Sequence, residues 1–248
     1  MIAIMNQKGG VGKTTTTLNL AHALAMSGNA VTVLDMDPQA HLTSCFGINT
    51  PDHIGMFDVL SGEVDINDAG VHVRENITLI PAGARLGEFE QAHIGGVKRG
   101  WLLSESTKNL KNQDYILIDC PPSSGMLTMN AILASKEMLI PVSGDYLALQ
   151  GLSRLINILK HIEERLSHAT KKWLVVTRFH SRRRLANEVR EKLNSYFPGQ
   201  LLATPIRETV ALAESPGFGK TIFEYKKSSN GAHDYHALAD DLLQGRTY

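Results

Sequence analysis

The chain has 248 residues, of which 43% are hydrophobic and 20% charged, proportions that are ordinary for a globular protein. No segment approaches 18 uninterrupted apolar residues, and the N-terminus lacks a basic region and cleavage site, which excludes a transmembrane helix and a signal peptide. Lys and Arg balance Asp and Glu at 25 each, but residues 1–149 hold 9 against 15 and residues 150–248 hold 16 against 10. Two cysteines give no disulfide framework and no metal-binding spacing, so a cytoplasmic protein is expected.

Short apolar runs alternate with helix-like segments along the chain. Strands are predicted at residues 2–5, 30–34, 77–80, 115–118, 138–142, 174–177 and 201–205. Helices are predicted at residues 13–27, 86–110, 127–135, 149–167, 184–197 and 233–244. Most of the strands are continuous Ile, Val and Leu runs, which is typical of strands buried on both faces of a parallel sheet. This order predicts an α/β fold with a doubly wound, mostly parallel sheet and helices on both faces, in a single domain over residues 1–248.

The stretch KGGVGKTT, residues 8–15, lies between the first predicted strand and the first predicted helix. This is a phosphate-binding position, because backbone N–H groups and a helix N-terminus point at the anion. The predicted nucleotide-binding residues of this loop are Gly9, Gly10, Val11, Gly12, Lys13, Thr14 and Thr15. In a phosphate loop of this kind Lys13 reaches the β- and γ-phosphates and the Thr14 hydroxyl ligates Mg²⁺. The loop is a variant, because Gln7 stands where a glycine is usual and Lys8 adds a second lysine.

Four segments resemble the ParA/MinD group of P-loop ATPases with a deviant Walker A motif, and the ParA branch is the better match. They are KGGVGKTTTTLNLAHALA, VLDMDPQAHLT, LIDCPPSSGMLTMNAI and TPIRETVALAESPGFGKTIFEY. The likeness covers nearly the whole chain and implies ATP and Mg²⁺ as cofactors of an ATPase that is weak without its partner. Longer ParA relatives carry an N-terminal helix-turn-helix, which is not expected here because the chain starts directly at the ATPase strand.

The resemblance gives the second lysine a role. Lys8 matches the family's signature lysine, which contacts the nucleotide of the other subunit in an ATP-sandwich dimer. Lys13 would neutralise phosphate charge in its own chain and Lys8 would do so across the dimer, as arginine fingers do, so both are predicted catalytic residues. The alternative for Lys8 is a solvated loop lysine.

Three aspartates, Asp35, Asp37 and Asp119, follow predicted strands. They leave the sheet at its carboxyl edge, where carboxylates can hold Mg²⁺ through its waters and orient an attacking water. The resemblance implies that Asp37 positions the hydrolytic water, that Asp35 supports the metal shell, and that Asp119 is the Walker B aspartate. For Asp37 and Asp119 the alternative is capping of the following turn.

The sequence gives weaker signals for the identity of the nucleotide base and for the role of the two cysteines. The chain has no N-K-x-D motif, which argues against a Ras-like guanine pocket. The resemblance implies adenine, held between the segment after WLVVT and the loop at residues 204–207, with Pro205 as a nucleotide-binding residue. Cys45 and Cys120 do not match the sequence context of the related iron–sulfur reductases, so Cys120 is expected to be a small buried thiol.

The stretch TRFHSRRRLANEVREKL gathers arginines around a loop and the start of a helix. Arginines at a helix N-terminus oppose the helix dipole, so helix stability does not explain them, whereas contacts with phosphates do. The predicted DNA-binding residues are Arg182, Arg183, Arg184, Arg207 and Lys220. No recognition helix or zinc finger is visible, so binding should be non-specific and sensitive to salt. A solvated basic face and a protein-binding surface are the alternatives.

These features predict a ParA-like ATPase that forms a homodimer on binding ATP and associates with nucleoid DNA. It would position a plasmid, a chromosome or a protein assembly with a ParB-like or cargo-adaptor protein that stimulates hydrolysis. The main alternative is a MinD-like membrane-associated regulator, although the final HALADDLLQGRTY does not read as a basic amphipathic anchor. A metabolic or iron–sulfur enzyme on the same scaffold is a third interpretation. Residues 47–70 match no motif and are either a nucleotide-sensitive or partner-binding region or an ordinary surface helix and turn.

Overall fold

The structure, a computed structural model, describes residues 1–48, 54–91 and 96–248. Its centre is a seven-stranded sheet with the strand order β3-β4-β2-β5-β1-β6-β7. The strands are β1 (Ile2–Ile4), β2 (Val31–Asp35), β3 (Val71–Arg74), β4 (Ile77–Ile80), β5 (Tyr115–Asp119), β6 (Glu137–Ser143) and β7 (Lys171–Thr177). All neighbouring strands are parallel except β3 and β4, so the predicted doubly wound, mostly parallel sheet is confirmed.

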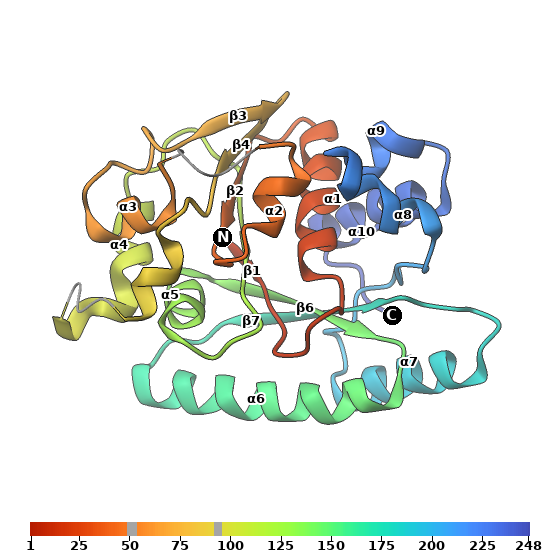
Figure 1. Cartoon of the computed structure of the whole chain (residues 1–248). Coiled ribbons are helices and arrows are strands. Elements are labelled where there is room, and N and C mark those ends of the chain that lie inside the picture. Colours follow the sequence, from red (N-terminus) through yellow and green to blue (C-terminus); the bar gives the residue numbers. More distant parts are fainter. Residues whose placement is uncertain (49–53, 92–95) are drawn as a thin grey trace.

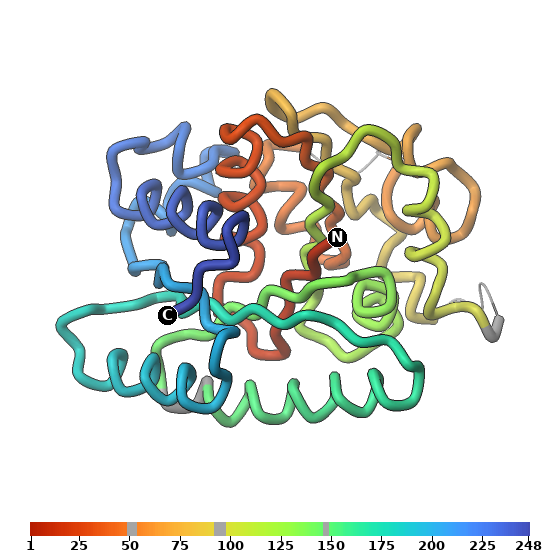
Figure 2. Tube along the Cα trace, turned by 180° about the vertical axis from the view of Figure 1, so that it is seen from behind, coloured from red at the N-terminus to blue at the C-terminus, as the bar shows by residue number. Residues whose placement is uncertain are grey.

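Helices cover both faces of this sheet (Figure 1). On one face α1 (Lys13–Met26) packs beside α10 (Asn230–Gln244), as Figure 2 also shows from behind. On the other face lie α5 (Met126–Ala134), α6 (Tyr146–Leu166) and α7 (Arg184–Tyr196). Successive residues of β1 and the Met5 that follows it enter opposite cores, with Ile2 and Ile4 in the core under α1, and Ala3 and Met5 in the core under α6.

The strand register brings the chemistry-bearing residues together. β5 lies between β1 and β2, and Asp119 is directly opposite both Ile4 and Asp35. The loop after β1 and the aspartates that end β2 and β5 therefore converge at one carboxyl edge of the sheet, where α/β folds bind their ligands.

The predicted helix over residues 86–110 is wrong as a single element. In the described part of this segment the chain forms η1 (Leu86–Glu90), η2 (Gly96–Trp101) and α4 (Leu102–Thr107), and residues 92–95 lie outside the described residues. Glycines at positions 87, 96 and 100 interrupt the apolar pattern, and glycine is among the poorest helix formers.

The predicted strand at residues 201–205 is also wrong. Leu201 forms only an isolated parallel bridge with Leu174, and Leu202 an antiparallel one with Thr247. Pro205 has no N–H with which to extend a ladder, so the chain leaves the edge of the sheet there.

Several short elements have no counterpart in the prediction. β3 is a mostly half-exposed strand that joins the edge of the sheet, so it lacks the apolar run of a buried parallel strand. The short helices are α2 (His41–Cys45), α3 (Met56–Ser61), α8 (Val210–Glu214), η3 (Ser215–Phe218) and α9 (Ile222–Lys226). For residues 47–70, positions 49–53 lie outside the described residues, and the following part contains the surface helix α3.

Candidate nucleotide-binding site

The phosphate loop runs from the end of β1 to the N-terminus of α1. Gly10 and Gly12 have φ angles of 73° and 87°, a left-handed conformation that side chains rarely adopt, so these two positions require glycine. Lys13 is the first residue of α1 and is only 8% exposed. Burial lowers the pKa of its ammonium group, and the neighbouring Asp119 carboxylate opposes this effect. The loop thus presents a helix N-terminus and a buried cation to one anion.

Two buried side chains fix this loop against the sheet. Asn6 Nδ2 donates to the Pro141 carbonyl at 2.8 Å, and Asn6 Oδ1 accepts from the Lys8 N–H at 3.0 Å. Thr177 Oγ1, at the end of β7, donates to the Val11 carbonyl at 2.8 Å. The loop is therefore anchored at its start through β6 and at its apex through β7. The sequence carries no local signal for either contact, because both cross the sheet.

Asp35 and Asp119 are buried side by side beneath the loop. Asp119 accepts hydrogen bonds from Thr14 Oγ1 at 2.8 Å and Thr17 Oγ1 at 3.1 Å. Asp35 Oδ2 accepts from both the N–H and the hydroxyl of Thr43, at 2.8 and 2.6 Å. Burial raises the pKa of Asp119 to about 8 and that of Asp35 to about 6, and the charge of Asp35 adds to the shift of Asp119. Such a pair of carboxylates favours a cation nearby.

The donor set suits Mg²⁺ bound together with a nucleotide. In the part of the chain that the structure describes, no three His, Cys, Asp or Glu side chains form a group that could hold a metal unaided. Mg²⁺ characteristically keeps several waters and binds one or two carboxylates together with substrate phosphates. Thr14 and Asp119, whose oxygens are already 2.8 Å apart, are the residues that would hold the ion, with Asp35 behind them. The ion would offset the cost of ionising Asp119.

An open pocket of about 650 Å³ lies over the loop, within the size range of ligand sites. Its lining comprises Gly9, Gly10, Gly12, Lys13, Thr14, Thr15, Asp37, Gln39, His41, Ser44, Cys45, Pro122, Pro216 and Gly217. Asp37 is half-buried, and its Oδ1 accepts from the Gln39 N–H at 3.0 Å. Its carboxylate therefore caps its own turn while it faces the pocket, and its role with water stays a prediction.

The second lysine is directed to a different partner. Lys8 Nζ lies 2.9 Å from both carboxylate oxygens of Asp145, and Ser143 Oγ donates to the same carboxylate at 2.7 Å. Lys8 is not among the described residues that line the phosphate pocket, so within one chain only Lys13 is placed to contact phosphate. Asp145 follows β6 much as Asp119 ends β5, and this position at a strand end is the sequence signal that could have identified it.

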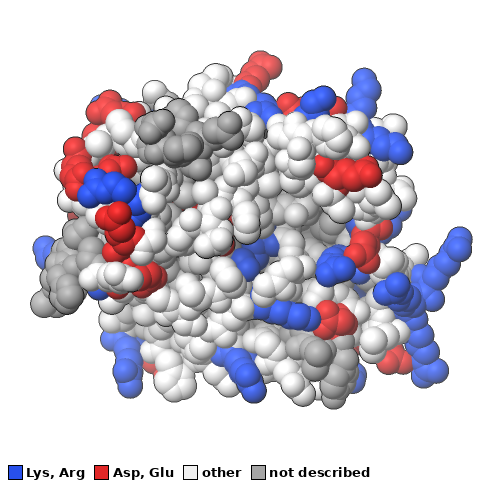
Figure 3. Space-filling model, viewed as in Figure 1, with Lys and Arg blue, Asp and Glu red and all other residues white. Residues whose placement is uncertain are grey.

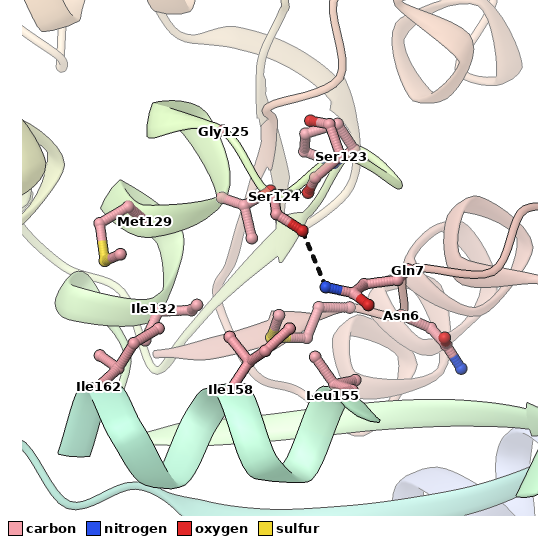
Figure 4. Close-up of a pocket in the computed structure, with 13 residues that line it drawn as sticks. Asn6, Gln7, Ser123, Ser124, Gly125, Met129, Ile132, Leu155, Ile158 and Ile162 are labelled. Atoms are coloured by element: carbon pink, nitrogen blue, oxygen red, sulfur yellow. Dashed lines mark hydrogen bonds between the residues drawn. The ribbon is translucent and has the colours of Figure 1, made fainter. Parts of the chain in front are cut away.

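Gln7, which replaces the usual glycine, connects the phosphate loop to the loop after β5. Its Nε2 donates to Ser124 Oγ at 2.8 Å, and Figure 4 shows both residues at a small cavity of about 50 Å³ lined below by α6. The same loop is held at the start of α5, where the Glu90 carboxylate accepts from the N–H groups of Met126 and Leu127 at 2.9 and 3.2 Å. The variant side chain thus links the loop that precedes Lys13 to the loop that follows Asp119.

A second pocket, of about 220 Å³, adjoins the first and shares Gly10, Gly12 and Thr15 with it. Its other lining residues are Thr177, Arg178, Ile206, Arg207, Glu208, Thr209, Leu212, Ala213 and Tyr235. The two segments expected to hold the base therefore meet beside the phosphate loop. The described lining contains Ile206 and Arg207 but not Pro205, so a contact between Pro205 and the nucleotide stays a prediction.

The residues predicted to bind DNA have different surroundings. Arg182, Arg183 and Lys220 are exposed and form no ion pair with any described residue. Arg184 is 93% exposed and pairs with Glu188 at 2.7 Å. The Arg207 guanidinium binds the buried Asp234 carboxylate, with a shortest contact of 2.6 Å, and lines the second pocket. Figure 3 shows Lys and Arg side chains projecting from the edge of the molecule at α7 and the loop before it.

The two cysteines are not placed for metal or redox chemistry. Cys120 is fully buried, as predicted, and burial raises the pKa of its thiol well above the ordinary value. Cys45 lines the phosphate pocket, where burial raises its pKa to about 11. Both thiols are therefore protonated at neutral pH and are poor nucleophiles and ligands.

Comparisons with known proteins agree with this geometry. A family model described as "AAA domain" matches residues 1–172. The sporulation initiation inhibitor protein Soj of Bacillus subtilis is 39% identical over 246 residues, which cover 98% of this chain and 97% of Soj.

Two solved structures with bound nucleotides are also similar. A Mycobacterium smegmatis protein named cobyrinic acid a,c-diamide synthase, bound to ADP and magnesium, is 30% identical with a TM-score of 0.84 and coverage of 98% and 93%. A Borrelia burgdorferi protein assigned to plasmid partition, bound to AMPPNP, is 28% identical with a TM-score of 0.84 and coverage of 98% of both chains. Because the Soj match extends over almost the full length of both proteins and the phosphate loop runs from β1 to the N-terminus of α1 as predicted, this chain belongs with Soj to the ParA family of ATPases.

Proposed function

We propose that the chain is a Mg²⁺-dependent ATPase that closes into an ATP-sandwich dimer, binds DNA without sequence preference, and positions a cargo through a partner that stimulates hydrolysis. The observation that carries this proposal is the separation of the two lysines. Lys13 lies inside the phosphate pocket, whereas Lys8 lies outside it on Asp145, with 36% of its side chain exposed. A lysine on the same loop but outside its own pocket is available to a second chain.

The site residues divide by role in this proposal. Lys13 and the loop amides bind the phosphates, Thr14 and Asp119 bind Mg²⁺ with Asp35 in support, Asp37 orients the attacking water, and Lys8 acts on the partner's nucleotide. Mg²⁺ supplies charge neutralisation on the phosphates, while the protein fixes their position. A site that is incomplete in one chain would hydrolyse ATP slowly until dimerisation and the partner complete it.

DNA binding is assigned to the exposed arginines at the start of α7. Arg182 and Arg183 have no described ion pair, so their charge is available to phosphates. The plasmid-partition assignment of the Borrelia burgdorferi relative supports a role in moving DNA, and a cargo made of protein is consistent with the same mechanism.

The helix α10 contributes apolar residues to the core, which bears on the membrane alternative. Tyr235, Leu238 and Ala239 of α10 are buried in the core under α1, whereas Leu243 is 39% exposed. Within the described residues, no helix is both long enough and apolar enough to cross a membrane.

The test is binding to random-sequence duplex DNA with no nucleotide, with ADP, and with a slowly hydrolysed ATP analogue, at two salt concentrations. We expect tight binding only with the analogue, weakened by salt, because phosphate contacts release counterions. Asp37→Ala should then hold the ATP-bound dimer on DNA without hydrolysis, whereas the exposed Asp68→Ala serves as a matched control. Normal hydrolysis by Asp37→Ala, or DNA binding that ignores the nucleotide, would refute the proposal.

A further inference from the structure

The second pocket contains a charged cluster that the phosphate chemistry does not use. Glu208 Oε1 accepts from Arg178 Nε and Nη2 at 3.0 and 2.8 Å, and Glu208 Oε2 lies 2.6 Å from His180 Nε2. Arg178 and Glu208 both line the pocket that adjoins the phosphate loop through Gly10, Gly12 and Thr15. A triphosphate seated in the first pocket would therefore bring its base to this cluster.

The backbone holds the cluster in place. Arg178 has a φ of 50°, an uncommon conformation for a residue with a side chain, which concentrates at ligand clamps and other functional sites. The Phe179 N–H donates to the Ile206 carbonyl at 3.0 Å, and the Glu208 N–H donates back to the Phe179 carbonyl at 3.3 Å. The N–H and the carbonyl of Phe179 thus both hydrogen-bond the segment that carries Glu208, which fixes that segment beside Arg178.

We propose that Glu208 selects the base of the nucleotide by accepting a hydrogen bond from the 6-amino group of adenine. This inference rests on the proposed ATPase function and adds a base-contacting residue to it. An ionised carboxylate offers about four lone-pair sites, and the contacts with Arg178 and His180 occupy three of them. The remaining lone pair is on Oε2. It can accept a hydrogen bond from a donor group of the base, whereas an acceptor group of the base would be repelled.

Adenine and guanine differ at this atom. Adenine carries a donor at position 6 and guanine carries an acceptor, so an oxygen of guanine placed here would face a carboxylate. The hydrogen bonds from His180 and Arg178 lower the pKa of Glu208, which keeps it ionised and unable to donate to guanine. The other acid in contact with a pocket-lining arginine, Asp234, is already bound by the backbone and guanidinium of Arg207.

The test measures the binding of ATP, GTP and purine riboside triphosphate, which lacks the 6-amino group, each with Mg²⁺. The intact protein should bind ATP roughly tenfold to a hundredfold more tightly than the 6-unsubstituted analogue, as expected for a hydrogen bond to a charged group. In Glu208→Ala this ratio should fall to about one, because the amino group has lost its acceptor. Glu208→Gln should narrow the preference for ATP over GTP, since its amide can donate to the guanine oxygen.

Two controls separate this inference from the proposed function. Glu188→Ala removes another arginine-bound glutamate, at 2.7 Å from Arg184 and outside the lining of the pocket, and should leave all three affinities unchanged. Lys13→Ala should weaken all three nucleotides by a similar factor. An unchanged ratio between ATP and the analogue in a folded Glu208→Ala protein would overturn the role of Glu208, even if ATP binding, dimerisation and DNA binding were normal. Failure of the intact protein to bind ATP would instead overturn the proposed function.

Discussion

Replacement of Asp145 by asparagine should strengthen the ATP-bound dimer. Lys8 Nζ lies 2.9 Å from both carboxylate oxygens of Asp145 within its own chain. In the proposed dimer Lys8 must leave this carboxylate before it can reach the partner's phosphates. Breaking the ion pair therefore opposes dimer closure, and it happens once in each of the two subunits.

The size of the effect follows from the exposure of the pair. The side chains of Lys8 and Asp145 are 36% and 48% exposed, and such solvent-accessible pairs are worth about 0.2–1 kcal/mol. Two pairs per dimer give about 0.4–2 kcal/mol, which corresponds to a dimer dissociation constant lowered by roughly twofold to thirtyfold. Asparagine keeps the size of the side chain and can still bond Ser143, so the change isolates the charge. The gain should shrink as salt screens the pair.

The assay is analytical ultracentrifugation over a range of protein concentrations, with a slowly hydrolysed ATP analogue and then with ADP, at two salt concentrations. Glu63→Gln is the control, because it removes a comparable ion pair, Glu63–Arg85 at 2.9 Å, that lies outside the nucleotide pockets. A dimer of unchanged strength in Asp145→Asn would refute the view that this carboxylate restrains Lys8. A weaker dimer would show that Asp145 itself contributes to the interface or to the nucleotide.

Three further predictions test other parts of the site. Binding of Mg²⁺ and nucleotide at pH 7 should release protons, because burial raises the pKa of Asp119 to about 8 and the cation requires its ionised form. Calorimetry in buffers of different ionisation enthalpy measures this release, and no release would contradict the prediction. Alanine at residues 182–184 should lower the salt slope of DNA binding by up to about three for each subunit of the dimer, and an unchanged slope would place the contacts elsewhere. Thr43→Val should reduce the free energy of unfolding by about 1–3 kcal/mol, because it leaves the Ala82 N–H without an acceptor and removes a hydrogen bond to Asp35. Thr43→Ser keeps the hydroxyl and should retain most of this free energy, and urea unfolding measures both variants.

The position of the phosphate loop between β1 and α1 could be predicted because its signals are local. Glycines at fixed spacing, a lysine and a threonine in eight consecutive residues define the loop, and apolar runs define the strands on either side of it. Asp35 and Asp119 could be identified because each ends such a run. The alternation of strands and helices implies a parallel sheet, so both residues leave it at the same edge, whereas the pairing of β2 with β5 that brings them together comes from the structure.

The contacts that complete the site could not be predicted, because they join residues far apart in the chain. Asn6 bonds Pro141, and Thr177 bonds Val11, across strands whose pairing no single segment encodes. Asp145 could have been noticed from its position after β6, but its contact with Lys8 follows only from the placement of β6 beside β1. In the segment from residue 86 a local signal was misleading. Its apolar spacing favours one helix, but its glycines interrupt that helix, and the described part forms η1, η2 and α4.

Among the five residues predicted to bind DNA, Arg207 requires a separate interpretation. Its guanidinium and backbone N–H bind Asp234, which is only 5% exposed, so Arg207→Ala leaves a buried carboxylate without its cation beside the base pocket. We therefore expect Arg207→Ala to weaken nucleotide binding first, and DNA binding only as a consequence, whereas Arg182→Ala should weaken DNA binding with nucleotide affinity unchanged. Titration of both variants with ATP before the DNA measurement decides the matter. If Arg207→Ala binds ATP normally but loses DNA, its charge reaches DNA in spite of Asp234, and the basic surface extends from α7 to the edge of the base pocket.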